Sequence, residues 1–481
     1  MIGSLPYKYS RLLEKIVSER FYSSEFDIEE PPKQVSSPEN ENLKNIKFIK
    51  LPIVYRKMEM SWKDGNQEDM YHLLECLCEY SQYQPILYSI DFINYHVCGL
   101  FITCLQYNSP RNLMIKTLEL LSHIFTSPKK QLGNFIISQK NNVIDVLYKL
   151  VIAFLDNPPD ENFPLIPVFL CLNCISSFSI EGCKQTFHLF FQQGECLVEK
   201  IIRLVSFVNI KPICCKLIRS ISQMKMEAVD AENLFKFVCS IWSECGKESG
   251  CHLVQTINNL LKIIPDKWND LFQKYNAYSL IFNCLVLDDQ NLAVPAIWCI
   301  VQLIAQNIPL TINFQYFIDL FQNEDLVQIS CWAIEMMVKI IPEYSRYLIQ
   351  HGLYETISLS LSNYQFNMSN DCIQCLCGVI ETKCPDCFEK IVKCNIIELL
   401  LDYLQSNVQL EFFPRVINAL TIIFESSIVI GEQKIVFNQF EENDGSNVMM
   451  TLSNKNDINL NNTLSILFKI YQSILQGLES R

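Results

Sequence analysis

The densest group of side chains that could do chemistry is a set of six cysteines, Cys372, Cys375, Cys377, Cys384, Cys387 and Cys394. It contains two C-x2-C pairs, and four thiolates in a tetrahedral arrangement form a common zinc site. However, Cys375 and Cys377 fall on different faces of an apolar helical segment, where cysteine behaves as a small hydrophobic residue. We therefore expect buried free thiols and no metal, and a zinc site is the alternative interpretation.

The sequence lacks the short motifs of the common enzyme classes. Residues 246–249 (GKES) lack the preceding glycine of a phosphate-binding loop, and none of the six histidines belongs to an H-E-x-x-H metal motif. No G-x-S-x-G sequence marks a nucleophilic serine. We expect a protein that is not an enzyme, with no catalytic residues and no cofactor.

Charge and composition limit the fold class and the kind of partner. The chain of 481 residues has 39 basic and 52 acidic side chains, a net charge of −13, whereas a general nucleic-acid binder needs a basic excess to release counterions. With only 13 glycines and 19 prolines, the chain has few of the turn residues that β-hairpins require. An all-α protein that does not bind nucleic acid is expected.

The N-terminus and the cysteines indicate the compartment. Charged residues interrupt the apolar ones throughout residues 1–20, so no core of a secretory signal is present. No window approaches the roughly 18 to 20 continuous apolar residues of a membrane-spanning helix. The 22 cysteines, many of them inside apolar stretches, are typical of reduced thiols. We expect a soluble protein of the cytoplasm and nucleus that has no membrane partner.

Internal repeats predict how helices position the remaining side chains. Residues 259–272 (NLLKIIPDKWNDLF) and 336–349 (MMVKIIPEYSRYLI) share a Lys-Ile-Ile-Pro-acid motif 77 positions apart, two steps of about 38 residues. Ten apolar segments recur at a similar interval, near residues 73, 117, 170, 213, 254, 297, 332, 373, 416 and 463. Stacking of such units would make one continuous core. We predict a mobile arm at 1–55, a solenoid of about ten helical repeats at 56–475 and a tail at 476–481.

One unit can be interpreted in more detail. Residues 332–362 predict a helix, a break at Pro342, a second helix, a stop at His351 and Gly352, and a third helix. Glycine can adopt the left-handed conformation that ends a helix.

With these features the chain resembles armadillo-repeat proteins, and in detail the importin-alpha branch of that family. The resemblance spans roughly 55–475 and rests on four stretches: MEMSWKDGNQEDMYHLLECL (58–77), AIWCIVQLIAQN (296–307), CWAIEMMVKIIPEYSRYLIQHGLYETI (331–357) and FEENDGSNVMMTLSNKNDINLNNTLSILFKIY (440–471). It implies a right-handed superhelical solenoid of the armadillo type.

The resemblance also implies a site. Family members bind extended peptides through a ladder of tryptophans, each followed by an asparagine at i+4, which places both side chains on one helix face. An indole pair forms a slot for a lysine stem. Here Trp298 with Gln302, Trp332 and Asn259 are the peptide-binding residues, although Met336 replaces one asparagine and Gln255 one tryptophan.

The earlier units keep less of the pattern. The corresponding pairs there are Leu118 with Ser122, Leu170 with Cys174, and Lys216 with Ser220. Only a partial site in the C-terminal half is expected. In the family, a strongly basic N-terminal segment recruits importin-beta. In this chain acidic residues are interspersed among the basic residues of the arm, so we do not expect the arm to recruit importin-beta.

The function implied is that of a non-enzymatic adaptor that binds basic nuclear-localisation peptides in a concave groove for import into the nucleus. The acidic net charge suits a basic partner. The alternative is an armadillo scaffold or regulatory protein that docks a folded partner and has no role in transport. The identity of the partner and the oligomeric state stay open.

Overall fold

The computed structural model describes residues 50–479 with short internal gaps. The positions outside the described residues are 1–49, 140–141, 158–162, 193–195, 205–209, 264–267, 286–288, 307, 309, 311, 364–365, 407–409, 456 and 480–481. Most of the predicted arm, 1–55, therefore lies outside them. Its last residues do not: helix α3 begins at Leu51, with a proline in its first turn, and Tyr55 is fully buried. A proline in the first turn of a helix costs no hydrogen bond, so Pro52 is compatible with this helix start. The predicted arm is therefore wrong for residues 51–55, which are helical.

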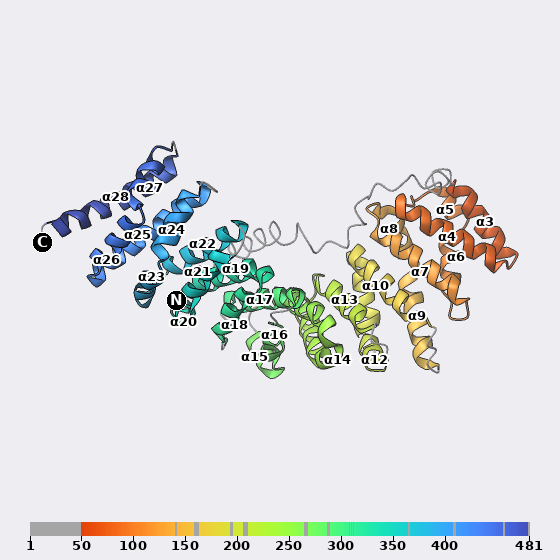
Figure 1. Ribbon diagram of the computed structural model, residues 1–481. Coiled ribbons are helices and arrows are strands. Elements are labelled where there is room, and N and C mark those ends of the chain that lie inside the picture. The colour runs from red at the N-terminus through yellow and green to blue at the C-terminus, as the bar shows by residue number, and fades with distance from the viewer. Residues whose placement is uncertain are drawn as a thin grey trace. The chain divides into compact units, whose positions relative to one another are not determined.

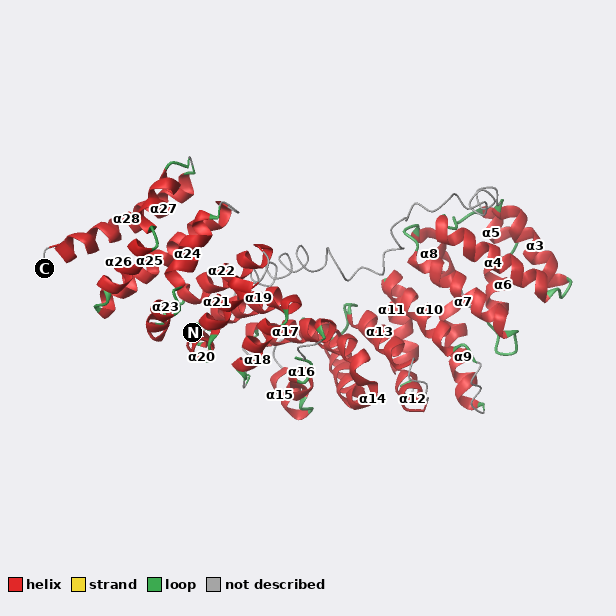
Figure 2. Cartoon of the chain, viewed as in Figure 1, coloured by secondary structure: helices red, strands yellow, loops and turns green. Residues whose placement is uncertain are grey.

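Every regular element in the described residues is a helix (Figure 2). The chain separates into two compact units, residues 1–101 and 102–481. The described part of the first contains α3 (Leu51–Lys63), α4 (Gln67–Tyr83) and α5 (Ile90–Asn94), and α6 (Val97–Cys104) crosses the boundary. Inside this first unit the Tyr55 ring packs edge-on against Phe92, with ring centroids 5.6 Å apart.

The second unit is a succession of helices (Figure 1), and from residue 268 onward short elements precede each long helix. Its first elements are α7 (Arg111–Thr126), α8 (Lys130–Ser138), α9 (Val143–Asp156), α10 (Leu165–Phe178), α11 (Ile180–Phe187), a π-helical turn (His188–Gln192), α12 (Leu197–Leu204), α13 (Ile210–Ser222) and α14 (Ala228–Leu261). They continue with α15 (Trp268–Lys274), α16 (Ala277–Phe282), α17 (Gln290–Ala305), α18 (Phe314–Asp319), a 3-10 turn (Leu320–Gln322) and α19 (Glu324–Ile340).

The remaining helices repeat a short, short, long order three times. They are α20 (Tyr344–Gln350), α21 (Leu353–Asn363) and α22 (Phe366–Glu381); a 3-10 turn (Pro385–Cys387), α23 (Phe388–Lys393), α24 (Ile396–Gln405), a second 3-10 turn (Leu410–Phe412) and α25 (Phe413–Ile430); and α26 (Gln433–Glu442), α27 (Gly445–Ser453) and α28 (Ile458–Glu479).

In the second unit the long helices pack in series, each against the next: α7, α10, α13, α14, α17, α19, α22, α25 and α28. The ten apolar segments found in the sequence lie on these helices and on α4. Each helix buries its apolar stripe against its neighbours; in α17, for example, the core side chains include Ile297, Ile300 and Ile304. A shared core of this kind is expected of stacked units that cannot bury their apolar faces alone.

The interpretation of residues 332–362 is confirmed at its breaks. Helix α19 ends at Ile340, α20 runs from Tyr344 to Gln350, and α21 starts at Leu353. Gly352 has a φ of +92°, in the left-handed region that glycine adopts without steric cost. The same junction in other triplets has Asn276, Asn395 and Asp444, with φ of 51°, 52° and 60°. Asn and Asp are the residues that tolerate this conformation best after glycine.

The expected tail at 476–481 is wrong for most of its length, because α28 continues to Glu479. Ile474, near the C-terminal end of α28, is buried. Packing of this residue keeps the chain helical beyond the predicted end of the solenoid.

One stretch departs from the expectation that no segment could cross a membrane. Residues 410–430 are long and apolar enough to do so, but 56% of the apolar window is buried. The stretch is mainly α25, which packs against α22, α24, α26 and α28. Its apolarity is explained by contacts on several sides.

Candidate peptide-binding site

The candidate site lies on the series of long helices. The four residues predicted to bind a peptide are on three consecutive members of it: Asn259 on α14, Trp298 and Gln302 on α17, and Trp332 on α19. Each of the four side chains is half-buried. The structure thus brings them together along neighbouring helices and leaves part of each accessible.

The two tryptophans stack on each other. Their ring centroids are 4.8 Å apart and the ring planes are inclined by 21°. A lysine stem held between two indoles needs a separation of about 7 to 8 Å, twice the carbon–carbon contact distance of 3.5 to 4.0 Å. The expected slot between Trp298 and Trp332 is therefore closed. The reason is that their helices are direct neighbours, so the two rings pack against each other and leave no space for a lysine stem.

Gln302 follows Trp298 by one helical turn. Its side-chain oxygen Oε1 is buried and accepts no hydrogen bond from any residue that the structure describes. A buried amide oxygen without a donor costs free energy, and a partner N–H would relieve that cost. Gln302 is therefore the predicted site residue that has a hydrogen-bond acceptor without a donor among the described residues.

Asn259 behaves differently, because its amide is engaged within the fold. Its Nδ2 donates to the hydroxyl of Ser222 on α13 over 2.9 Å. The adjacent Asn258 is buried and donates to the backbone oxygen of Pro295 on α17 over 3.0 Å. Of these two asparagines only Asn259 is partly accessible, and both of them tie α14 to a neighbouring helix.

The earlier helices lack indoles at the matching positions, as the sequence indicates. Leu118 on α7 is fully buried, while Leu170 on α10 is 39% exposed. On α13, Lys216 is exposed and Ser220 donates to Asn173 of α10 over 2.7 Å. On α10 and α13 a hydroxyl–amide hydrogen bond links the neighbouring helices at these positions.

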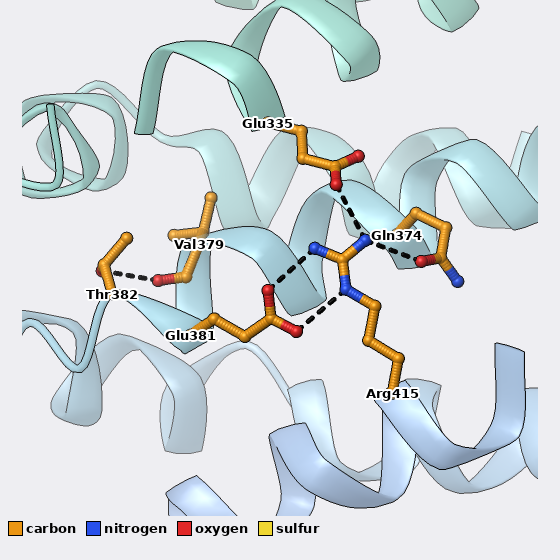
Figure 3. A network of polar contacts seen from close by, with 6 residues as sticks. All are labelled: Glu335, Gln374, Val379, Glu381, Thr382 and Arg415. Carbon is orange, nitrogen blue, oxygen red and sulfur yellow. Dashed lines mark hydrogen bonds and ion pairs between the residues drawn. The ribbon is translucent and has the colours of Figure 1, made fainter. Parts of the chain in front are cut away.

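A charged cluster that the sequence did not predict includes Glu335, three residues after Trp332 on α19 (Figure 3). The guanidinium of Arg415, from α25, donates two hydrogen bonds to Glu381 of α22, at 2.9 and 2.8 Å. It also donates to Glu335 of α19 and Gln374 of α22, both at 2.8 Å. One arginine thus joins three consecutive long helices by a bidentate and two single bonds, the geometry for which guanidinium is suited.

Gly378 makes room for this cluster. A Cβ atom at that position would lie 3.0 Å from Cγ of Glu335 and 3.3 Å from Nη2 of Arg415. Burial lowers the pKa of Arg415, but the carboxylates of Glu381 and Glu335 outweigh it and raise the pKa overall. The signal in the sequence was that Arg415 is the lone charge between Glu411 and Glu425, since a charge on an apolar helix is usually paired.

Helix α13 brings basic side chains to the series. Lys216 is exposed and Arg219 half-buried on α13. Burial first, and then the charges of Arg219 and Lys216, lower the pKa of His252 on α14 from its ordinary 6.5 to about 4. The acidic net charge of the chain is therefore not spread evenly over the candidate site.

The cysteines form no metal centre in the part of the chain that the structure describes. No group of three or more His, Cys, Asp or Glu side chains there could hold a metal ion, and all 22 cysteines are free thiols. Cys331 of α19 donates to the sulfur of Cys372 of α22 over 3.8 Å. Cys375 and Cys377 are both fully buried, so they pack as small apolar side chains.

Comparison with known proteins supports the fold alone. No protein-family model matches the chain, and no curated protein sequence matches it. Among solved structures, the chain is similar to a crystal structure of an engineered protein from the Northeast Structural Genomics Consortium, with a TM-score of 0.61 and 11% sequence identity. The similarity covers 87% of this chain and 99% of that one. At this identity it shows a shared all-helical architecture.

Proposed function

We propose that this chain is a non-enzymatic protein-binding adaptor with an armadillo-type solenoid fold of about ten repeats. The recurrence of two short helices and one long helix, with a left-handed residue between the short ones, supports the armadillo type. The series of long helices supplies the binding surface. Solenoids of this kind commonly use such extended surfaces for partner recognition.

One observation carries the proposal: the buried, unpartnered oxygen of Gln302 lies one turn from the half-buried indole of Trp298. An extended peptide offers backbone N–H groups that an amide oxygen can accept, while aromatic side chains are common anchors at interfaces. After a rotation of its side chain that brings the buried oxygen to the surface, Gln302 would accept from the peptide backbone. The indole pair would support an apolar or alkyl side chain on its accessible surface.

In its sharper form the proposal is an importin-alpha-like adaptor that binds basic nuclear-localisation-type segments, works in the cytoplasm and nucleus and serves nuclear import. Glu335 and Glu381 share one arginine, Arg415, so this cluster keeps an excess of negative charge. That excess and the net charge of −13 favour a basic partner. Because the indole slot is closed, a lysine stem would lie across the outer edge of the pair.

The test is a titration of the full chain with a fluorescent lysine-rich nuclear-signal peptide and with an uncharged scrambled peptide. Selective binding that weakens with added salt is expected, because ions screen the attraction between exposed charges. Trp332→Ala should weaken binding by roughly 1 to 3 kcal/mol. The control is Trp62→Ala, which removes an indole that is 38% exposed in the first unit and should leave binding unchanged.

A second candidate is supported by the closed indole pair and by the bond of Asn259 to Ser222. It is an armadillo scaffold or regulatory protein that docks a folded partner without a role in transport. Equal, weak binding of both peptides with no effect of Trp332→Ala would overturn the adaptor and favour this scaffold.

A further inference from the structure

Two pairs of thiols join consecutive long helices in the second unit. Cys215 of α13 donates to the sulfur of Cys245 of α14 over 3.6 Å. Cys331 of α19 donates to Cys372 of α22 over 3.8 Å. The two pairs are therefore alike in place and in separation. In each pair the sulfurs are in contact, and a disulfide would require them to approach to 2.0 to 2.1 Å.

The pairs differ in access. Cys245 is 6% exposed, whereas Cys331 and Cys372 are each 1% exposed. A small oxidant can therefore reach the sulfur of Cys245 with less opening of the fold. Reactivity of cysteine follows access together with thiolate character.

The pairs also differ in charge. Lys211 of α13 donates to the backbone oxygen of Glu244, the residue before Cys245, over 2.8 Å. The hydrogen bond from Cys215, and secondly the charge of Lys211, lower the pKa of Cys245 in spite of its burial. Burial raises the pKa of Cys331 well above its ordinary value. Both the greater exposure of Cys245 and the nearby charge of Lys211 make the first pair the more reactive one toward an oxidant.

We propose that Cys215 and Cys245 are an oxidative modification site, at which a peroxide converts the two thiols into a reversible disulfide that links α13 to α14. This goes beyond the binding function proposed above and does not depend on it. The link would tie two neighbouring members of the series of long helices, next to the basic side chain of Lys216.

The chemistry balances with hydrogen peroxide as the oxidant. The thiolate of Cys245 attacks one peroxide oxygen, the O–O bond breaks and hydroxide leaves, which gives a sulfenic acid. The sulfur of Cys215 then attacks the sulfenic sulfur, so that the S–S bond forms and the S–O bond breaks. Together the two thiols lose two electrons and two protons, and the peroxide becomes two molecules of water.

The experiment uses the full chain, reduced, freed of reductant and treated with hydrogen peroxide. After free thiols are blocked, digestion without reductant and mass spectrometry identify the linked peptides. The 215–245 link is expected to form several-fold faster than the 331–372 link, because Cys245 is the more exposed thiol and lies beside the charge of Lys211. Added dithiothreitol should reverse it.

Variants separate this proposal from general oxidation. Cys215→Ser should leave Cys245 as a sulfenic acid that dimedone labels, and Lys211→Met should slow the modification several-fold. Lys216→Met, which removes an exposed charge of the same helix, is the control and should change little. Circular dichroism checks that each variant stays helical, and Lys211→Met tests the proposal if Cys215→Ser does not fold.

Three results would overturn the proposal. The first is equal rates at the two pairs, the second is an absence of modification at Cys245, and the third is a set of links spread over many cysteines or between molecules.

Discussion

Trp298 of α17 and Trp332 of α19 lie face to face, with centroids 4.8 Å apart and planes 21° apart. Their positions on neighbouring helices were expected from the sequence, but the stacking was not. It makes each indole part of the other's packing, so a substitution at either position acts on the stability of the solenoid as well as on any peptide bound there.

A double-mutant cycle measures that coupling. In urea unfolding, Trp298→Ala and Trp332→Ala should each destabilise the chain, and the double variant should cost less than the sum of the two. The coupling expected is about 0.5 to 1.5 kcal/mol, the range for aromatic pairs. Strict additivity would mean that the two rings do not interact in solution.

Gln302→Leu tests the amide in the candidate site. Leucine keeps the side chain a similar size and removes the unpartnered oxygen, so stability should be unchanged or higher while peptide binding weakens by roughly 0.5 to 1.5 kcal/mol. Fluorescence anisotropy and urea unfolding give the two readouts. Equal binding by the variant would show that Gln302 makes no bond to the peptide.

Replacing Arg415 with Met should destabilise the chain by roughly 1 to 3 kcal/mol, because Glu335 and Glu381 lose their common charged donor. The matched control is Lys393→Met. It breaks an exposed pair with Glu389 one turn away and should change the free energy of unfolding by less than about 0.5 kcal/mol. Similar losses in the two variants would contradict a structural role of the cluster.

Gly352→Ala tests the junction between α20 and α21. An alanine at a φ of +92° should cost roughly 1 to 2 kcal/mol, because its Cβ opposes the left-handed conformation. Gly99 lies within α6 and has open space around a Cβ, so Gly99→Ala should stabilise by up to about 1 kcal/mol. Urea unfolding of both variants should therefore give shifts of opposite sign.

The pH dependence of stability should include a contribution from His252. Burial, with the charges of Arg219 and Lys216, lowers its pKa from 6.5 to about 4 in the folded chain. Between these two values the unfolded chain binds a proton that the folded chain does not, so stability rises with pH in that interval. The contribution is complete above about pH 6.5 and is lost as the pH falls toward 4.

His252→Gln removes that proton and should make the thermal midpoint fall less steeply between pH 7 and pH 4. His188→Gln changes an exposed histidine and is the matched control substitution. An unchanged slope in His252→Gln would show that the ring is protonated as readily in the folded chain as in the unfolded one.

Local features of the fold could be predicted from the sequence because neighbouring residues decide them. Apolar residues at helical spacing placed all ten recurring segments on helices, and Pro342 and Gly352 marked the ends of α19 and α20. A proline lacks the N–H that a helix interior needs, and a left-handed residue ends a helix wherever it occurs. Neither effect depends on the rest of the molecule. The choice of Trp298, Gln302, Trp332 and Asn259 rested instead on the resemblance to importin-alpha, and the structure places them on consecutive long helices.

What only the tertiary structure decided is how side chains from different helices meet. The stacking of Trp298 on Trp332, the bond from Asn259 to Ser222 and the carboxylates around Arg415 depend on distances between helices that are 30 to 80 residues apart in the chain. Periodicity gives the face of a helix on which a residue lies but not the separation from the next helix. That separation is set by packing of the buried side chains between them, and it closed the expected slot while leaving the oxygen of Gln302 without a donor among the described residues.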